Sequence, residues 1–256
     1  IPGMILLVET SEQRFIGSAG LADIESQEAM QTYHIMPNGS AGKKLTALFV
    51  AMLEEEGMLN IDNTLDTWLS EALLVQIAHS DKMTLRQLLN HTSGVYDYLD
   101  DNDFNDAVLL DPSSLKTDHY ALQFALNKSA SFEPAQGWDY SNTGYLLAGL
   151  IMDEVLGEHH SSEMRNRILD PLGMNSSHYG GVEKEQGAII SGYYKYEDGE
   201  ILNTKSFYEN FGVADAPLVA SVEDMALLLK TIINDDSSVS DHAKGALFGE
   251  DNLQSM

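Results

Sequence analysis

The chain has 256 residues, of which 43% are apolar, so it is long enough to bury a core as one large domain or as two lobes. Its 14 basic and 40 acidic side chains give a formal net charge of -26. Nucleic acid and anionic lipid repel such a polyanion, which excludes both classes of partner. Cysteine is absent, which excludes disulfides, zinc–thiolate sites and a thiol nucleophile.

The first half of the chain predicts strands followed by helices. Alternating apolar residues predict strands over 4–9 and 14–24, joined by a polar turn. A densely apolar stretch predicts a buried helix over 38–57, which ends at Gly57. Further helices are expected over 84–89 and 143–156.

The second half returns to strands. A helix over 161–169 should stop at Pro171, whereas the acidic stretch 97–106 is expected to be a loop. A strand is predicted over 188–196, with a hairpin turn at Asp198-Gly199. Ser221 and Asp224 predict a capping box and a helix through Ile233. This order predicts an α+β fold, with helices packed beside an antiparallel sheet.

Ser40 and Lys43 are the first candidates for chemistry. They lie three residues apart where the first buried helix begins, so their side chains share a helix face. Free N–H groups at a helix start stabilise an oxyanion, and a desolvated amine can accept the serine proton. The small residues Ala41 and Gly42 between them are expected to leave room for a substrate. Because Ser-x-x-Lys recurs at Ser113 and Lys116, an N-cap role for Ser40 stays open.

Tyr140 and Asn142 form a second candidate pair, just before the apolar helix over 143–156. A phenol near a cation can act as a general acid or base, and an amide can both donate to and accept from a substrate. The same Tyr-x-Asn spacing occurs at Tyr208 and Asn210 in a polar segment. A packed tyrosine beside a capping asparagine is therefore the alternative interpretation.

Seven segments along nearly the whole chain carry a family resemblance when they are taken in order: Pro2–Gly3, Gly17–Asp23, Gly39–Lys43, Glu56–Asn63, Leu88–Val95, Tyr140–Tyr145 and Asp170–Met174. In this order they resemble the serine β-lactamase and penicillin-binding protein superfamily. The most similar branch contains class C β-lactamases, D-alanyl-D-alanine carboxypeptidases and related esterases.

The resemblance implies a single domain over 1–256 with two lobes and a site between them. Residues 1–60 and 185–256 would form an α/β lobe, and residues 61–184 a mostly helical lobe. The resemblance further implies a small-molecule or peptide substrate, no cofactor, no metal and a periplasmic or extracellular location.

The same resemblance assigns the roles within the site. Ser40 would be the acylated nucleophile, and Lys43 and Tyr140 would handle its proton, with either of them as the base. Asn142 would bind the amide of the substrate. The expected function is a serine hydrolase that forms an acyl-enzyme with an amide, a β-lactam or an ester.

A third family motif, a Lys or His followed by a small residue and Gly on a late strand, has no counterpart at the expected place. His178–Gly181 has similar letters but follows the Pro-Leu-Gly-Met turn too closely, and His242–Gly245 lies in a polar stretch. We therefore expect that the C-terminal strands of the sheet lie beyond Met256. The alternative function is a catalytically incomplete binding or sensing module on the same fold.

Three other sites are rejected on their spacing. Gly42-Lys43 lacks the flanking residues of a phosphate-binding loop, and Asp101–Asn105 lacks the Gly and Glu of a calcium loop. His159-His160 has no third ligand at metal-binding spacing and is expected to be a surface pair. His91 is expected to be structural, and Lys44 to point to solvent.

Overall fold

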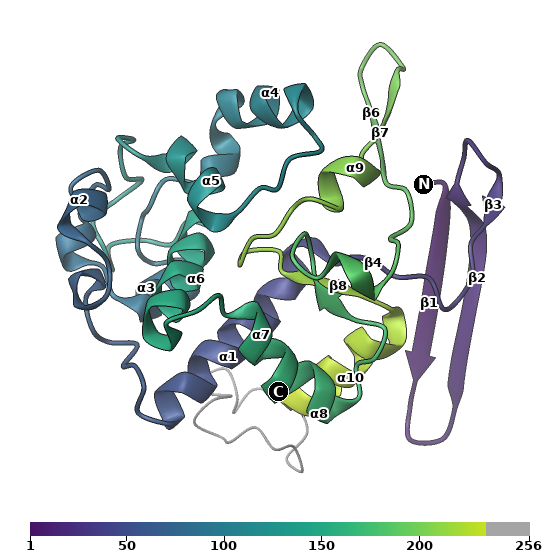
Figure 1. Cartoon of the computed structure of the whole chain (residues 1–256), viewed down its shortest axis with the longest axis horizontal. Coiled ribbons are helices and arrows are strands. Elements are labelled where there is room, and N and C mark those ends of the chain that lie inside the picture. Colours follow the sequence, from purple (N-terminus) through teal and green to yellow (C-terminus); the bar gives the residue numbers. More distant parts are fainter. Residues whose placement is uncertain (234–256) are drawn as a thin grey trace.

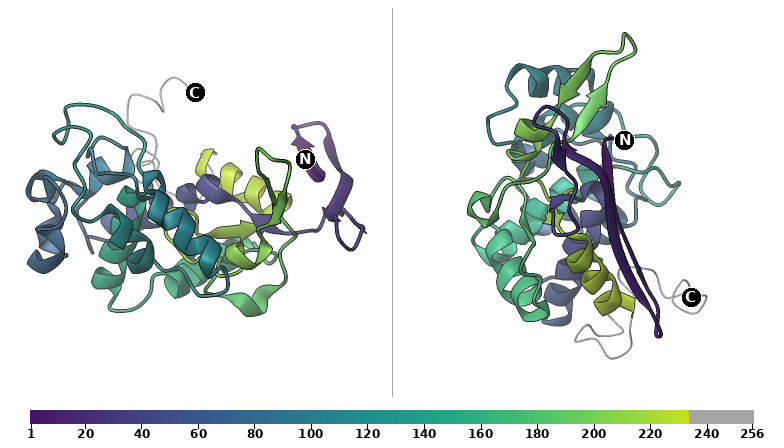
Figure 2. Two further views of the ribbon diagram at one scale, coloured as in Figure 1. Left: turned by 90° about the horizontal axis from the view of Figure 1, so that it is seen from above. Right: turned by 90° about the vertical axis from the view of Figure 1, so that its right-hand side faces the viewer.

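The computed structural model describes residues 1–233, which form helices and antiparallel strand pairs (Figure 1). Strands β1 (Gly3–Glu9) and β2 (Arg14–Asp23) pair in register from Gly3 opposite Gly20 to Glu9 opposite Arg14. The short strand β3 (Glu28–Ala29) adds to the outer side of β2. Both predicted N-terminal strands are confirmed, and Figures 1 and 2 place them at one edge of the molecule.

The first buried helix is divided into two parts. A 3-10 turn, η1 (Gly39–Gly42), leads directly into α1 (Lys43–Glu55). Every residue of α1 from Leu45 to Ala51 is buried, so the middle of α1 is covered on all sides, and it packs against α6 (Thr143–Leu156). Helix α1 ends before Gly57, whose φ of 72° suits a residue without a Cβ.

A small central sheet leads into η1, the turn that carries Ser40. Its strand order is β4 (Met36–Pro37), β8 (Leu218–Ala220) and β5 (His178–Tyr179), and both pairings are antiparallel. Strand β4 enters η1, and β8 continues into α10 (Val222–Ile233). The predicted helix through Ile233 is confirmed. Ser221 caps the N–H of Asp224, but the Asp224 carboxylate accepts from Ser176 and Ser177.

Short helices fill the side of the molecule opposite β1 and β2 (Figures 1 and 2). In chain order they are η2 (Leu65–Thr67), α2 (Glu71–Leu74), η3 (Ser80–Lys82), α3 (Leu85–Leu89), η4 (Tyr98–Asp100), α4 (Asn102–Leu110), α5 (Asp118–Leu122) and η5 (Gln123–Ala125). Thr84 closes a full capping box on α3, and Thr117 caps α5. All of these helices except η3 contribute residues to one buried apolar cluster that they share with α1 and α6.

The prediction of an acidic loop over 97–106 was wrong. Asp101 accepts a hydrogen bond from the N–H of Asp103 at 2.8 Å and so caps α4. Phe104 and Val108, four residues apart, bury the inner face of this helix. One of the acidic residues that suggest a solvated loop, Asp101, therefore caps a helix.

Two predicted boundaries also differ from the structure. The helix that starts with α7 (Ser161–Met164) widens to a π-helical turn over Arg165–Leu169, labelled η6, and runs past Pro171 in α8 (Asp170–Leu172). It ends at Gly173, whose φ is 72°.

The strand predicted over 188–196 is much shorter than expected. It is reduced to β6 (Tyr193–Lys195), because the N–H groups of Ile190 and Ser191 donate to separate segments of the chain. The hairpin turn at Asp198-Gly199 is confirmed, and β7 (Ile201–Asn203) pairs with β6. Two further short helices, η7 (Lys184–Gln186) and α9 (Lys205–Tyr208), flank this hairpin in the chain.

Candidate active site

Ser40 lies within η1, at the entrance to the central helix. The N–H of Asn38 donates to the Leu218 carbonyl at 2.9 Å, which anchors η1 to β8. A Cβ on Gly42 would lie 3.1 Å from the backbone nitrogen of Leu218, so Gly42 allows η1 to pack closely on β8. The expectation that Gly42 leaves room for a substrate is therefore wrong. The Ser40 side chain is exposed and caps no helix, which rules out the N-cap interpretation.

The ammonium of Lys43 is buried and points to Ser40. Its Nζ donates to Ser40 Oγ at 3.3 Å, to Asn142 Oδ1 at 2.7 Å and to the backbone carbonyl of Asp215 at 2.8 Å. The three protons of an ammonium thus have three acceptors. Lys43 is held beside the hydroxyl whose proton it is predicted to handle.

Tyr140 lies on the solvent side of the same lysine. Its ring centroid is 5.2 Å from Lys43 Nζ, and its ring packs on the imidazole of His91 at a centroid distance of 4.3 Å. A pocket of about 200 Å³ is lined by Ser40, Lys43, Lys44, Ala47, His91, Tyr140, Tyr145 and Ile232. The structure therefore brings the three predicted catalytic side chains into one pocket. Their roles stay predictions.

Asn142 is almost completely buried on the protein side of Lys43. Its Oδ1 accepts from Lys43, and its Nδ2 donates to Asp97 Oδ2 at 2.7 Å. Because an ionised carboxylate can only accept, Asp97 fixes which end of the amide faces the lysine. The structure thus shows Asn142 orienting Lys43, while its predicted contact with a substrate amide stays a prediction.

His91 supports the pocket wall, as expected for a structural residue. Its Nδ1 accepts from the N–H of Ser141 at 3.3 Å, and its backbone carbonyl accepts from Asp139 at 3.0 Å. Burial, together with the nearby charge of Lys43, lowers the pKa of His91. A neutral imidazole can therefore lie beneath the Tyr140 ring without adding a second positive charge.

Asp215 and Tyr98 are site residues that the sequence reasoning missed. The Asp215 carboxylate lies 3.7 Å from Lys43 Nζ, and the Tyr98 hydroxyl donates to it at 3.3 Å. Burial raises the pKa of Asp215 to about 6, and the charge of Lys43 opposes that rise. The available signal was an acid inside the otherwise apolar run 211–220.

Lys44 does not simply point to solvent as expected. It is half-buried and lines the same pocket as Ser40. The second Ser-x-x-Lys match forms no comparable site, because Lys116 is buried and its Nζ donates to Asp111 and Ser114. His178 lies on β5 and lines a different pocket, and His242–Gly245 lies outside the described residues.

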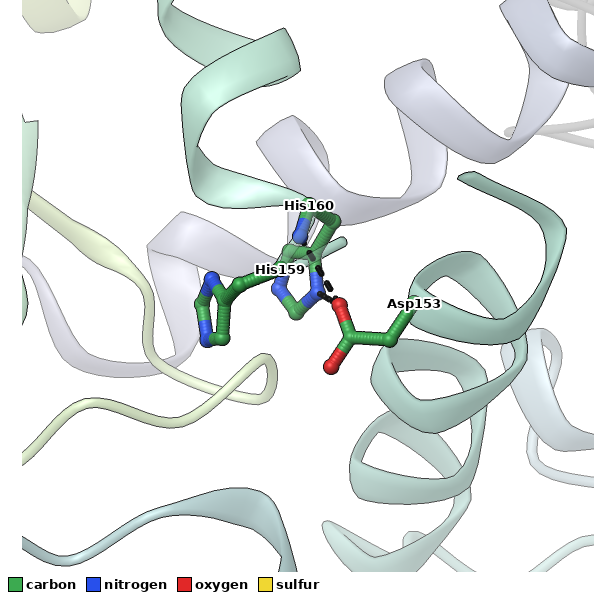
Figure 3. A group of neighbouring side chains, drawn as sticks. All are labelled: Asp153, His159 and His160. Carbon is green, nitrogen blue, oxygen red and sulfur yellow. Dashed lines mark hydrogen bonds and ion pairs between the residues drawn. The ribbon is translucent and has the colours of Figure 1, made fainter. Parts of the chain in front are cut away.

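The prediction that His159 and His160 form a surface pair without a third ligand was wrong. His160 is fully buried, and Asp153 joins both histidines in a compact cluster, the one such group of possible metal ligands within residues 1–233 (Figure 3). His160 Nδ1 contacts Asp153 Oδ1 at 2.6 Å, and its Nε2 contacts the Tyr179 hydroxyl at 2.8 Å.

These contacts give the histidine cluster a structural role. A metal ion would have to displace the existing partners of His160, and the two imidazoles stack with centroids 4.5 Å apart. The cluster instead joins the end of α6 to α7 and β5.

At the rejected calcium loop, Asp101 pairs with Lys128.

The chain belongs to the Beta-lactamase family, whose sequence model matches residues 1–254. It is 30% identical to penicillin-binding protein 4* of Bacillus subtilis over 177 residues, which cover 68% of this chain and 37% of that protein. The fold resembles that of a D-stereospecific amidohydrolase from Streptomyces sp., with a TM-score of 0.83 and 23% identity over 96% of this chain and 72% of that one.

A second solved structure has a similar fold. The octameric penicillin-binding protein homologue of Pyrococcus abyssi has a TM-score of 0.80 and 27% identity, covering 95% of this chain and 55% of that chain. The curated relatives are longer proteins, and the chain spans 37% of the first and 46% of a staphylococcal Protein flp. Within residues 1–233, the structure contains no helix long and apolar enough to cross a membrane.

Proposed function

We propose that the protein is a serine hydrolase that forms an acyl-enzyme on Ser40. The observation that carries this proposal is the position of Lys43, whose buried amine lies 3.3 Å from the exposed Ser40 hydroxyl. Family membership supports the same function, as does the similarity of the chain to a penicillin-binding protein. The substrate would be an amide, a β-lactam or an ester.

The proposed reaction has two steps. Ser40 Oγ attacks the carbonyl carbon, its proton passes to Lys43 or Tyr140, and the tetrahedral intermediate expels an amine or alcohol that takes up a proton. Water then attacks the acyl-enzyme ester, releases the acid and returns the hydroxyl to Ser40. The hydrogen bonds of Asn142 and Asp215 to Lys43 align the amine for both proton transfers.

The choice of base between Lys43 and Tyr140 stays open. Lys43 has the direct contact with Ser40, whereas Tyr140 is more exposed and lines the pocket next to the amine. Either group would need to release a proton before it could accept one from serine. We therefore assign the pair jointly to proton transfer.

The alternative proposal is a binding or sensing module with an incomplete site. The contact between Ser40 and Lys43 favours catalysis over this alternative. A hydrolysis panel separates the two, with a chromogenic cephalosporin, a D-amino acid anilide and a short-chain nitrophenyl ester as substrates. We expect turnover of at least one substrate and its loss in Ser40→Ala, with Ser113→Ala as the matched control that retains it.

A further inference from the structure

We propose that Asp215 is a positioning residue for the acylation of Ser40, and that its carboxylate is the buried counter-ion that holds the Lys43 ammonium. The positioning role rests on the proposed serine-hydrolase function. The ion pair itself can be tested without turnover. Asp215 contacts Lys43 twice, through its backbone carbonyl at 2.8 Å and its carboxylate at 3.7 Å.

The Asp215 carboxylate is itself held in place by Tyr98. The Tyr98 hydroxyl donates to both carboxylate oxygens, at 3.4 Å and 3.3 Å. The Tyr98 ring is fully buried, and the backbone N–H of Tyr98 donates to Thr143 Oγ1 at 2.9 Å on the first turn of α6. The residue that holds the counter-ion is thus anchored to the first turn of α6, the helix that begins directly after Asn142, another side-chain partner of Lys43.

Other acidic groups surround the pair, and each has a different partner. Asp97, which precedes η4, binds the amide of Asn142, and Asp118 on α5 accepts from the N–H of Ala214 at 2.8 Å. Burial is the main cause that raises the pKa of Asp97 and the pKa of Asp118. Among these carboxyls, Asp215 is the one whose contact with Lys43 is direct.

The remaining neighbours are phenols and an imidazole. Burial raises the pKa of Tyr98 and the pKa of Tyr179, so both stay protonated at neutral pH. On the pocket side, Lys43 faces the rings of Tyr140 and Tyr145, and burial lowers the pKa of His91. Among the described groups around Lys43, the Asp215 carboxylate is therefore the charged group that lies in direct contact with the ammonium.

The counter-ion has a predictable effect on the reaction. A buried negative charge beside Lys43 stabilises the ammonium and opposes proton release from the site. If Lys43 is the base, removal of that charge favours the free amine. If Tyr140 is the base, the uncompensated lysine favours the phenolate. Both mechanisms therefore predict that the acid limb of the pH–rate profile moves to lower pH when Asp215 is neutralised.

The ion pair is tested first by NMR titration of carboxyl carbons in protein labelled at aspartate. The signal of Asp215 is assigned by its disappearance from the spectrum of Asp215→Asn or by through-bond connectivity. In Lys43→Met, this signal should titrate about one pH unit or more higher than in wild type. Lys128→Met is the matched control, because Lys128 pairs with Asp101 and should leave Asp215 unchanged. An unchanged Asp215 titration in folded Lys43→Met would overturn the proposal.

The effect on the reaction is tested with a fluorophosphonate that labels the wild-type serine. The acid limb of the labelling rate should shift about one pH unit downward in Asp215→Asn and stay in place in Asp118→Asn. A loss of rate at every pH without a shift would indicate a merely structural role and overturn the positioning role. Wild type that labels nowhere would contradict the serine-hydrolase function, while the NMR titration would still decide the ion pair.

Discussion

At the scale of single residues, the site is organised around one buried ammonium. Lys43 has hydrogen-bond acceptors from its own helix turn, from the segment before α6 and from the segment before β8. Because all three protons are satisfied by the protein, the amine has little freedom to turn away from Ser40. The orientation of the nucleophile's partner is therefore set before any substrate binds.

The fold should become less stable as Asp215 ionises. The pKa of folded Asp215 is raised to about 6 from a model-peptide value of 3.8, mainly by burial, so the folded state keeps a proton that the unfolded state releases between these values. The stability that this bound proton contributes is fully present below the pKa of unfolded Asp215. It is lost as the pH rises through the pKa of folded Asp215. The expected loss is about 3 kcal/mol.

Urea unfolding of wild type and Asp215→Asn, measured from about pH 4 to about pH 7, checks this expectation. Asparagine does not titrate, so Asp215→Asn should gain stability relative to wild type as the pH rises. Parallel curves for the two proteins across this interval would show that Asp215 does not titrate there.

At the scale of elements, the contact of α6 with the segment that carries Asp215 depends on Gly149. A Cβ at this position would lie 2.6 Å from the Ala214 Cβ and 2.7 Å from Asp118 Oδ2. The residue before Asp215 therefore approaches α6 to a distance that a larger side chain would prevent.

Gly149→Ala should destabilise the fold although alanine is the better helix former. Its propensity gain of about 0.5–1 kcal/mol is smaller than the typical overpacking cost of about 1–3 kcal/mol. Chemical unfolding of Gly149→Ala, Ala214→Gly and the double variant forms a cycle in which the second change should restore part of the loss. A more stable Gly149→Ala protein would contradict the close packing.

The elements also show what the sequence can predict. Dense apolar runs correctly predicted α1 and α6, because a long apolar run that ends at a glycine is a local signal of a buried helix. The acidic segment 97–106, which includes the start of α4, was mistaken for a loop, since capping by Asp101 and the buried positions of Phe104 and Val108 outweigh its polarity. The strand over 188–196 was overestimated, because the partners of its N–H groups come from distant parts of the chain.

The same distinction holds in the active site. Ser40, Lys43 and Tyr140 could be found from short-range patterns and family resemblance, and the structure brings them into one pocket. Asp215 lies 172 positions from Lys43 along the chain, so no local spacing could join them. Burial of His160 was missed for a similar reason, because its partner Tyr179 belongs to a separate strand.

At the scale of the whole molecule, the α+β fold is confirmed, while its division into two lobes and the assigned site roles stay predictions. The net charge of -26 affects every part of the fold. Many like charges repel one another in the compact state, and salt screens that repulsion. Screening extends over about 10 Å at 0.1 M salt and about 3 Å at 1 M salt.

The melting temperature should therefore rise as sodium chloride increases from about 0.1 M to about 1 M. A variant with four exposed acids neutralised, at Glu12, Asp106, Glu158 and Glu197, should show a smaller rise, because it carries less repulsion to screen. Calorimetry of both proteins at matched pH measures the difference. A melting temperature that is flat or falls with salt in wild type would contradict a dominant role for repulsion.

The most direct test of the central claim is the intact mass of the protein after reaction with a fluorophosphonate and, separately, with a labelled penicillin. We predict a single adduct that peptide mapping places on Ser40, that is lost in Ser40→Ala and that is retained in Ser113→Ala. Absence of an adduct with either probe on the folded protein, or an adduct that persists in Ser40→Ala, would contradict Ser40 as the nucleophile.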